Sequence, residues 1–196
     1  MILEDNPYGD LRVEGEKLPS IKSFDESGNV IYAGSFSKIL SPGLRVAYAI
    51  GPDKVLAKMT VGKQASDVHT SVLNQMIVYR WLTQCAPEKH IEKICSIYRK
   101  KRDLMTSCID SELGGFVDYV RPDGGLFVWC RLPENVDMLE FVKKAIDQKV
   151  AVVPGNAFLM NDCDKCSYIR LNYSTPSDEK IVEGVKRLGN AAKSYM

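Results

Sequence analysis

The sequence predicts an α/β fold in which the end of a mixed, mainly parallel sheet is followed by a smaller α+β unit. Two short, nearly continuous apolar runs, at residues 30–33 and 45–50, are typical of strands buried on both faces of such a sheet. After residue 86, a long helical pattern gives way to alternating strands and helices, which indicates a second unit. The chain has 196 residues, 45% hydrophobic and 26% charged, enough for one or two such cores.

Residues 1–86 predict the end of a larger sheet domain. An apolar stretch at residues 2–3 runs into an acidic, turn-rich loop, and the two apolar runs follow it. Helices are expected over residues 52–63 and 71–84. Three strands and two helices would leave apolar faces and a strand edge uncovered, so we expect a truncated domain here.

Residues 87–114 predict a long helix that links the two parts. Apolar residues recur along it at steps of three and four, Pro87 fits its first turn, and the pair Gly114-Gly115 fits its end. A helix of about 25 residues is long for a globular domain, which favours a bridge between domains.

Residues 115–196 predict a small α+β domain. The triplet Pro122-Asp123-Gly124 is typical of a turn between two strands, and Ser177 is expected to cap the last helix. The expected elements are strands at residues 116–121, 125–132, 150–153 and 168–173, and helices at residues 138–149 and 177–192.

Charge and hydropathy indicate which classes of binding partner are not expected for this chain. The net charge is +1 and no long basic run occurs, so neither nucleic acid nor an anionic membrane is expected as a partner. The N-terminal sequence MILEDNPYGDL lacks the pattern of a signal peptide, and no apolar run approaches the ~20 residues that span a bilayer. We expect a cytoplasmic protein.

The six cysteines do not predict a metal site. Cys163 and Cys166 have the C-x-x-C spacing of half a zinc site or of a redox pair. A structural zinc ion needs four ligands, and neither a second pair nor a nearby histidine supplies the others. We therefore expect free thiols in a polar loop and no bound metal.

Lys38 is the first candidate for chemistry, because it follows a buried strand at the point where a sheet presents its ligands. A primary amine there can condense with an aldehyde. Ser35, Ser37 and Arg45 lie in the same segment and offer several hydrogen-bond donors to one phosphate. An isolated loop lysine is more often a solvated charge. A catalytic role for Lys38 is therefore indicated only in combination with other residues.

Asp5 and Tyr8 add to this pattern. An aspartate beside a pyridine nitrogen keeps that nitrogen protonated, and the ring then acts as an electron sink. A tyrosine hydroxyl three residues on can hydrogen-bond a phenolic oxygen of the same ring. An Asx turn at Asp5-Asn6-Pro7, with a packed tyrosine after it, explains these residues equally well.

Arg170 and Gly125 are the candidates in the second part. Arg170 interrupts an otherwise apolar strand, and its planar guanidinium suits bidentate capture of a carboxylate. The alternative is an arginine on the solvated face of that strand. Gly125 and the segment 154–158 are turns where small residues let a ligand approach the backbone, although turn chemistry alone also accounts for them.

Five segments of the sequence carry a resemblance to a known family, and they occur in that family's order: EDNPYGDLR, GSFSKILSPGLRVAYAIGP, RPDGGLFVWCRLP, VVPGNAF and YIRLNYSTPSDEKIVEGVKRL. With these segments the chain resembles the fold-type I enzymes that depend on pyridoxal phosphate (PLP), and within them the class I/II aminotransferases. The resemblance is strongest to the branch of 2-aminoadipate and kynurenine aminotransferases and MocR-type regulators. It implies that residues 1–86 end the large PLP-binding domain, residues 87–114 form a linking helix, and residues 115–196 form the small C-terminal domain.

The resemblance also implies roles for the candidate residues. Lys38 would carry PLP covalently and move the proton at the substrate α-carbon, Asp5 would pair with the pyridine nitrogen, and Tyr8 would bond the ring oxygen. Three residues would hold the phosphate: Ser35, Ser37 and Arg45. Arg170 would bind the α-carboxylate, and Gly125 would lie near the substrate.

The implied reaction is a ping-pong transfer of an amino group between an α-amino acid and a 2-oxo acid, in a homodimer. Family members are about twice this length, and their upstream half supplies further cofactor contacts. Three alternatives remain open: a PLP β-lyase, the effector-sensing domain of a MocR-type regulator, and a non-catalytic fragment. His69 lies in a loop that could approach a partner subunit's site.

Overall fold

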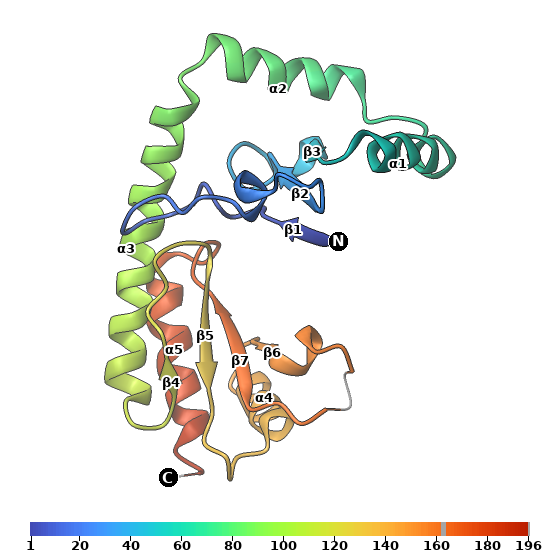
Figure 1. The fold of residues 1–196 in the computed structure, drawn as a ribbon. Helices are drawn as coiled ribbons and strands as arrows, with labels where there is room; N and C mark the ends of the chain where they lie inside the picture. Colours follow the sequence, from blue (N-terminus) through green and yellow to red (C-terminus); the bar gives the residue numbers. More distant parts are fainter. Residues whose placement is uncertain (162–163, 196) are drawn as a thin grey trace. The chain divides into compact units, whose positions relative to one another are not determined.

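The computed structural model describes residues 1–161 and 164–195. The chain divides into two compact units, Met1–Cys95 (unit 1) and Ser96–Met196 (unit 2). The long helix α3 (Pro87–Leu113) runs through the division, and its bounds lie within one residue of the predicted ones (Figure 1).

Unit 1 is built on a three-stranded sheet in the order β1-β2-β3. Its strands are β1 (Ile2–Asp5), β2 (Val30–Ser35) and β3 (Ala47–Ile50). The first pair is parallel and the second is antiparallel, so the sheet is mixed but not mainly parallel as predicted. The reason is the short segment between β2 and β3, because parallel neighbours need a longer crossover.

The strand β3 corrects a second expectation, that both of its faces are buried. Tyr48 is 42% exposed and Ile50 is 50% exposed. In the described part of the chain no further strand pairs with β3, so one of its edges has no partner. The helices of this unit are also mostly exposed. None of the residues of α1 (Asp53–Ser66) is buried, and in α2 (Val72–Gln84) only Val78 is buried.

The start of β2 is fixed by Asp25, which follows the short helix η1 (Ile21–Phe24). The Asp25 carboxylate accepts hydrogen bonds from Lys22 Nζ at 2.8 Å and from the backbone N–H groups of Asn29 and Val30, both at 2.9 Å. The lysine and the two amide donors favour the ionised carboxylate and hold its pKa well below the usual range.

Replacing Asp25 with asparagine is expected to destabilise unit 1 at neutral pH and to matter less in acid. A lowered folded-state pKa contributes stability that is present above the unfolded value of about 3.9 and is lost as the pH falls through the folded value. The difference in melting temperature between the wild type and Asp25→Asn, measured from pH 7 to pH 2, should therefore begin to shrink below about pH 4 and should shrink further as the pH falls. A difference that stays constant over this range would contradict the assignment.

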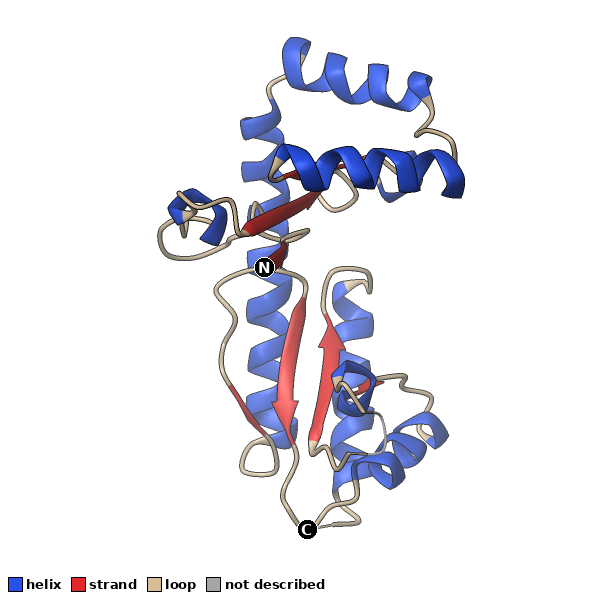
Figure 2. Cartoon of the chain, turned by 45° about the vertical axis from the view of Figure 1, so that its right-hand side comes forward, coloured by secondary structure: helices blue, strands red, loops and turns tan. Residues whose placement is uncertain are grey.

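Unit 2 is a two-layer α/β structure whose sheet is wholly antiparallel, in the order β4-β5-β7-β6 (Figure 2). The inner residues of its two central strands, such as Val128 and Ile169, are fully buried in a core with α3 and two further helices. The strands are β4 (Asp118–Tyr119), β5 (Phe127–Arg131), β6 (Val153–Pro154) and β7 (Tyr168–Asn172), and the helices are α4 (Met138–Asp147) and α5 (Asp178–Ala192).

The edge strands of unit 2 are shorter than predicted. Residues 116–121 pair only at Asp118–Tyr119, and residues 150–153 give a strand only at Val153–Pro154. The second difference has a local cause: Lys149 takes a φ of 62°, and the amide of Val150 still donates to Ala145 in α4. The predicted cap of α5 is confirmed, because the Ser177 side chain accepts a hydrogen bond from the Lys180 amide.

Two further features bear on the expectations about membranes and about the C-x-x-C pair. No helix in the described residues is both long and apolar enough to cross a membrane. Cys163, half of the C-x-x-C pair, lies outside the described residues, whereas Cys166 is half-buried and packs against the core of unit 2.

Candidate active site

The carboxyl ends of β1 and β2 meet at one edge of the sheet in unit 1, because the two strands are parallel. Asp5 ends β1 opposite Ala33, and the Asn6 amide extends the pairing with a 2.9 Å hydrogen bond to the Ala33 carbonyl. Ser35 ends β2 two residues later. The geometry thus brings the predicted residues Asp5 and Ser35 to the edge where open sheets present ligands.

Lys38 lies in a single helical turn directly after β2. The Phe36 carbonyl accepts from the amides of Leu40 at 2.9 Å and Ser41 at 3.2 Å, and the Phe36 amide donates to the Val46 carbonyl at 3.2 Å. The Ser37 amide donates to Ser35 Oγ at 3.1 Å. These bonds fix the backbone on both sides of Lys38.

The Lys38 ammonium lies beside Tyr8, with Nζ 5.8 Å from the centre of the ring. Among the described residues, neither the Lys38 amine nor the Asp5 carboxylate makes a hydrogen bond or an ion pair within the chain. A half-buried amine and an exposed carboxylate at one sheet edge, both without such partners in the described residues, are suited to a ligand that carries both an aldehyde and a basic ring nitrogen.

Arg45 closes the same loop in a left-handed conformation, with φ 54° and ψ 38°, after the short helix η2 (Pro42–Leu44). Its Nη1 donates to the Pro42 carbonyl at 3.2 Å, and the Leu44 carbonyl accepts from Asn74 of α2 at 2.9 Å. The guanidinium is exposed, with donors to spare for an anion. Within the described part, no hydrogen bond joins Arg45 to Lys38.

Arg170 lies in unit 2, on the face of the sheet that points away from the helices. It is half-buried, with its guanidinium carbon 3.9 Å from the centre of the Phe127 ring and 4.5 Å from that of Phe158. Its Nε is buried and has no hydrogen-bond partner in the described residues. Arg170 is therefore not simply a solvated strand residue.

Gly125 takes a φ of 79°, a conformation that favours glycine, and a side chain there would meet no atom within 4 Å. Its carbonyl accepts a 2.7 Å hydrogen bond from the hydroxyl of the fully buried Tyr173. The turn before β5 is thereby tied to the end of β7.

Removing that hydroxyl by Tyr173→Phe is expected to lower the unfolding free energy of the chain by about 1–2 kcal/mol, because a buried hydrogen bond is lost. Urea unfolding curves measure the change. Tyr168→Phe is the matched control, since the Tyr168 hydroxyl makes no hydrogen bond among the described residues. Equal losses in the two variants would contradict the role of the bond to Gly125.

A family model supplies the decisive comparison. The model for aminotransferase class I and II matches residues 1–188. The chain belongs to this aminotransferase family.

Individual members of the family agree with the match. The chain is 40% identical to aromatic-amino-acid aminotransferase 1 of Thermococcus litoralis, over 100% of this chain and 47% of the relative. It is 40% identical to 2-aminoadipate transaminase of Thermus thermophilus, over 100% of this chain and 50% of the relative. The chain thus spans about half the length of these relatives.

A solved aminotransferase structure agrees in fold. Kynurenine aminotransferase of Pyrococcus horikoshii, in complex with PMP, KYN as substrates and KYA as products, superposes with a TM-score of 0.94 at 38% identity. The match covers 99% of this chain and 48% of that one.

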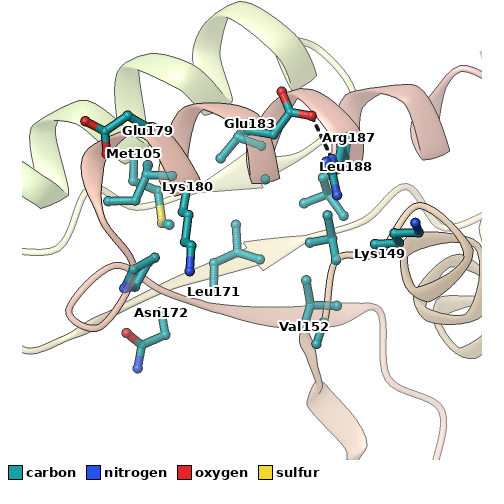
Figure 3. Close-up of a pocket in the computed structure, with 16 residues that line it drawn as sticks. Met105, Lys149, Val152, Leu171, Asn172, Glu179, Lys180, Glu183, Arg187 and Leu188 are labelled. Atoms are coloured by element: carbon teal, nitrogen blue, oxygen red, sulfur yellow. Dashed lines mark hydrogen bonds and ion pairs between the residues drawn. The ribbon is translucent and has the colours of Figure 1, made fainter.

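A cavity of about 610 Å³ in unit 2 is distinct from the aminotransferase candidate residues (Figure 3). Its lining includes Val152, Leu171 and Leu188, together with the Glu183–Arg187 ion pair of α5. Leu171 and Arg170 are neighbours in one strand, so their side chains point to opposite faces of the sheet. The cavity therefore lies on the other face from Arg170.

Cys108 and Cys130 of unit 2 do not suggest thiol chemistry of their own. Burial raises the pKa of Cys130 to about 12 and also raises that of Cys108, so both remain protonated at neutral pH. The described residues hold no cluster of side chains suited to a metal ion.

The aromatic residues around Arg170 were not among the predicted site residues. Phe127 and Trp129 both lie on the outer face of β5, and Phe158 ends the segment 154–158, for which the sequence predicts only a turn of small residues. The alternation in FVW places these two rings on one face, which was a usable signal. The contact with Phe158 has no local signal, because it joins segments far apart in the chain.

Proposed function

We propose that this chain supplies the lysine-bearing half of a PLP-dependent aminotransferase, which transfers an amino group between an α-amino acid and a 2-oxo acid. One observation carries the proposal: Asp5 ends β1 and Lys38 follows the parallel strand β2 at one sheet edge, and neither side chain has a hydrogen-bond or ion-pair partner among the described residues. Family membership over residues 1–188 supports the same chemistry.

The side chains of unit 1 fit the cofactor by their chemistry. PLP, when bound, supplies an electron sink next to the substrate α-carbon. Lys38 would hold the cofactor and then move the proton at that carbon, while Asp5 would accept the N–H of the pyridine ring. Tyr8, whose ring lies beside Lys38, would bond the ring oxygen.

The phosphate would be held by the loop that carries Lys38. Ser35 Oγ already accepts the Ser37 amide, which leaves its own hydrogen free to donate to an anion. Arg45 uses a single hydrogen bond, to Pro42, and is exposed, so its remaining donors can meet a dianion. We assign Ser35, Ser37 and Arg45 to the phosphate on this basis.

The substrate would be recognised through its α-carboxylate by Arg170, whose charge no acidic side chain neutralises among the described residues. Gly125 would lie near the substrate, where a residue without a side chain leaves room. The relatives act, by their names, on aromatic amino acids and on 2-aminoadipate, so we infer an α-amino acid with a bulky side chain. A cytoplasmic homodimer, completed by the rest of the family fold, is part of the proposal.

Amino-group transfer tests the proposal. The purified chain is incubated with PLP, 2-oxoglutarate and, in turn, kynurenine, 2-aminoadipate or phenylalanine, and glutamate and the new 2-oxo acid are quantified. Equimolar formation of both products is expected. Release of ammonia and pyruvate from a β-substituted amino acid would indicate a lyase instead. A PLP-dependent shift in amino acid binding without product would favour a regulatory effector domain.

A further inference from the structure

Arg170 lies in β7, between the neighbouring strands β5 and β6. It lies directly opposite Trp129 of β5 on one side and Val153 of β6 on the other. Phe127 is the diagonal neighbour on β5, since it pairs with Asn172. One aromatic ring therefore comes to Arg170 from β5, and the segment that follows β6 can bring a second.

The second ring arrives through the short helix η3 (Gly155–Phe158) that follows β6. Gly155 lets this helix approach β7 closely: a Cβ there would lie 2.5 Å from the Tyr168 carbonyl oxygen. Phe158 then meets Trp129 edge to face at 5.4 Å, and Trp129 stacks on Tyr168 at 5.4 Å. These contacts hold the Phe158 ring in place although it is 49% exposed.

We propose that Phe127 and Phe158 are positioning residues that clamp the Arg170 guanidinium between their rings and leave its two Nη groups as the fork that meets a carboxylate. The proposal rests on the proposed function, in which Arg170 binds the substrate. Both rings lie within cation–π distance of the guanidinium carbon, at 3.9 Å and 4.5 Å.

The burial of Nε decides which edge of the guanidinium is used. Arg170 Nε has almost no accessible surface and no hydrogen-bond partner among the described residues, so an anion cannot bind across Nε and one Nη. The remaining planar fork is Nη1 and Nη2, which matches the two oxygens of a carboxylate.

Aromatic rings can orient the Arg170 guanidinium without occupying its N–H donors, which an acidic neighbour could not do. A carboxylate beside Arg170 would also fix its orientation, but it would occupy the N–H donors and neutralise the charge that a substrate needs. Two rings restrict the side chain and shield it from water while every Nη donor stays open. The clamp therefore prepares the arginine before the substrate arrives.

The test uses Phe127→Leu and Phe158→Leu, with Phe127→Tyr and Phe158→Tyr as variants that keep the ring. Phe24→Leu is the matched control, because it replaces a phenylalanine ring that is 73% exposed in unit 1 and that, among the described residues, makes no ring contact to Arg170. Arginine side-chain NMR of the 196-residue chain is recorded, with Arg170→Lys to assign the signals, and pyruvate is then titrated at low salt.

Stacked rings should place the Arg170 Hδ signals upfield in the wild type, both tyrosine variants and the control. In the leucine variants these signals should move downfield, and pyruvate should bind about 3- to 30-fold more weakly. Leucine variants with unchanged signals and unchanged affinity would overturn the clamp. Ring-shifted signals that pyruvate does not perturb, even in the wild type, would support the clamp and overturn the substrate role of Arg170.

Discussion

Replacing Lys38 with alanine is expected to abolish the visible absorption band of the chain with PLP and to lower amino-transfer rates by about 100- to 10,000-fold. The loss combines two effects. The amine that we propose to hold the cofactor disappears, and proton transfer by a positioned side chain typically contributes a factor of this size. Absorption spectra and initial rates, measured side by side on the wild type and Lys38→Ala, give both readouts.

A second lysine substitution controls for charge and folding. Lys17 is 80% exposed at its side chain, and its one ion pair among the described residues is with Asp10, at 3.2 Å. Lys17→Ala removes the same charge and should leave the band and the rate unchanged. If Lys38→Ala kept its band while Lys17→Ala lost it, the site would not lie at the edge of β1 and β2.

Replacing Phe141 with alanine is expected to lower the unfolding free energy of unit 2 by about 3–5 kcal/mol. Phe141 is fully buried in α4, and its ring centre lies 5.7 Å from that of Phe116 and 6.1 Å from that of Tyr195. Truncation removes apolar contacts and leaves a cavity that two fixed rings cannot fill. Urea unfolding followed by circular dichroism measures the change.

Leu139 in the same helix is the matched control. It is 48% exposed, so Leu139→Ala removes less buried surface and should cost below about 1 kcal/mol. Both variants place an alanine in α4, so the control also includes the effect of alanine on helix propensity. A similar loss in the two variants would show that the aromatic core does not dominate the stability of unit 2.

Membership of the aminotransferase family offers an explanation for the exposed apolar side chains of unit 1. Its exposed apolar side chains are those of a sheet and helices that would be covered in a larger domain, and the chain spans about half the length of its relatives. We propose that the remaining part of the family fold covers them. The exposed side chains of α2 illustrate the point: Val72, Leu73, Met76, Ile77, Tyr79 and Leu82.

Local patterns were enough to predict several features of this protein. The spacing of apolar residues predicted α3 within one residue of its bounds, and Ser177 was identified as the cap of α5. The placement of Lys38 after a strand followed from the sequence, because an apolar run that ends in a glycine- and serine-containing loop specifies a strand end by itself. Backbone propensity and capping act within a few residues, so one segment determines them.

The features that the sequence did not determine depend on contacts between distant segments. The antiparallel pairing and exposure of β3 depend on which neighbours the sheet has, and the ends of β4 and β6 depend on how long a partner strand continues. The proposed aromatic clamp on Arg170 involves β5, β7 and η3, and only the assembled sheet brings Phe127 and Phe158 within cation–π distance of one guanidinium. The sequence alone thus determined the residue types and local elements of the candidate site. Their orientation was decided by the tertiary structure, because cross-strand register and packing place side chains that no local pattern can relate.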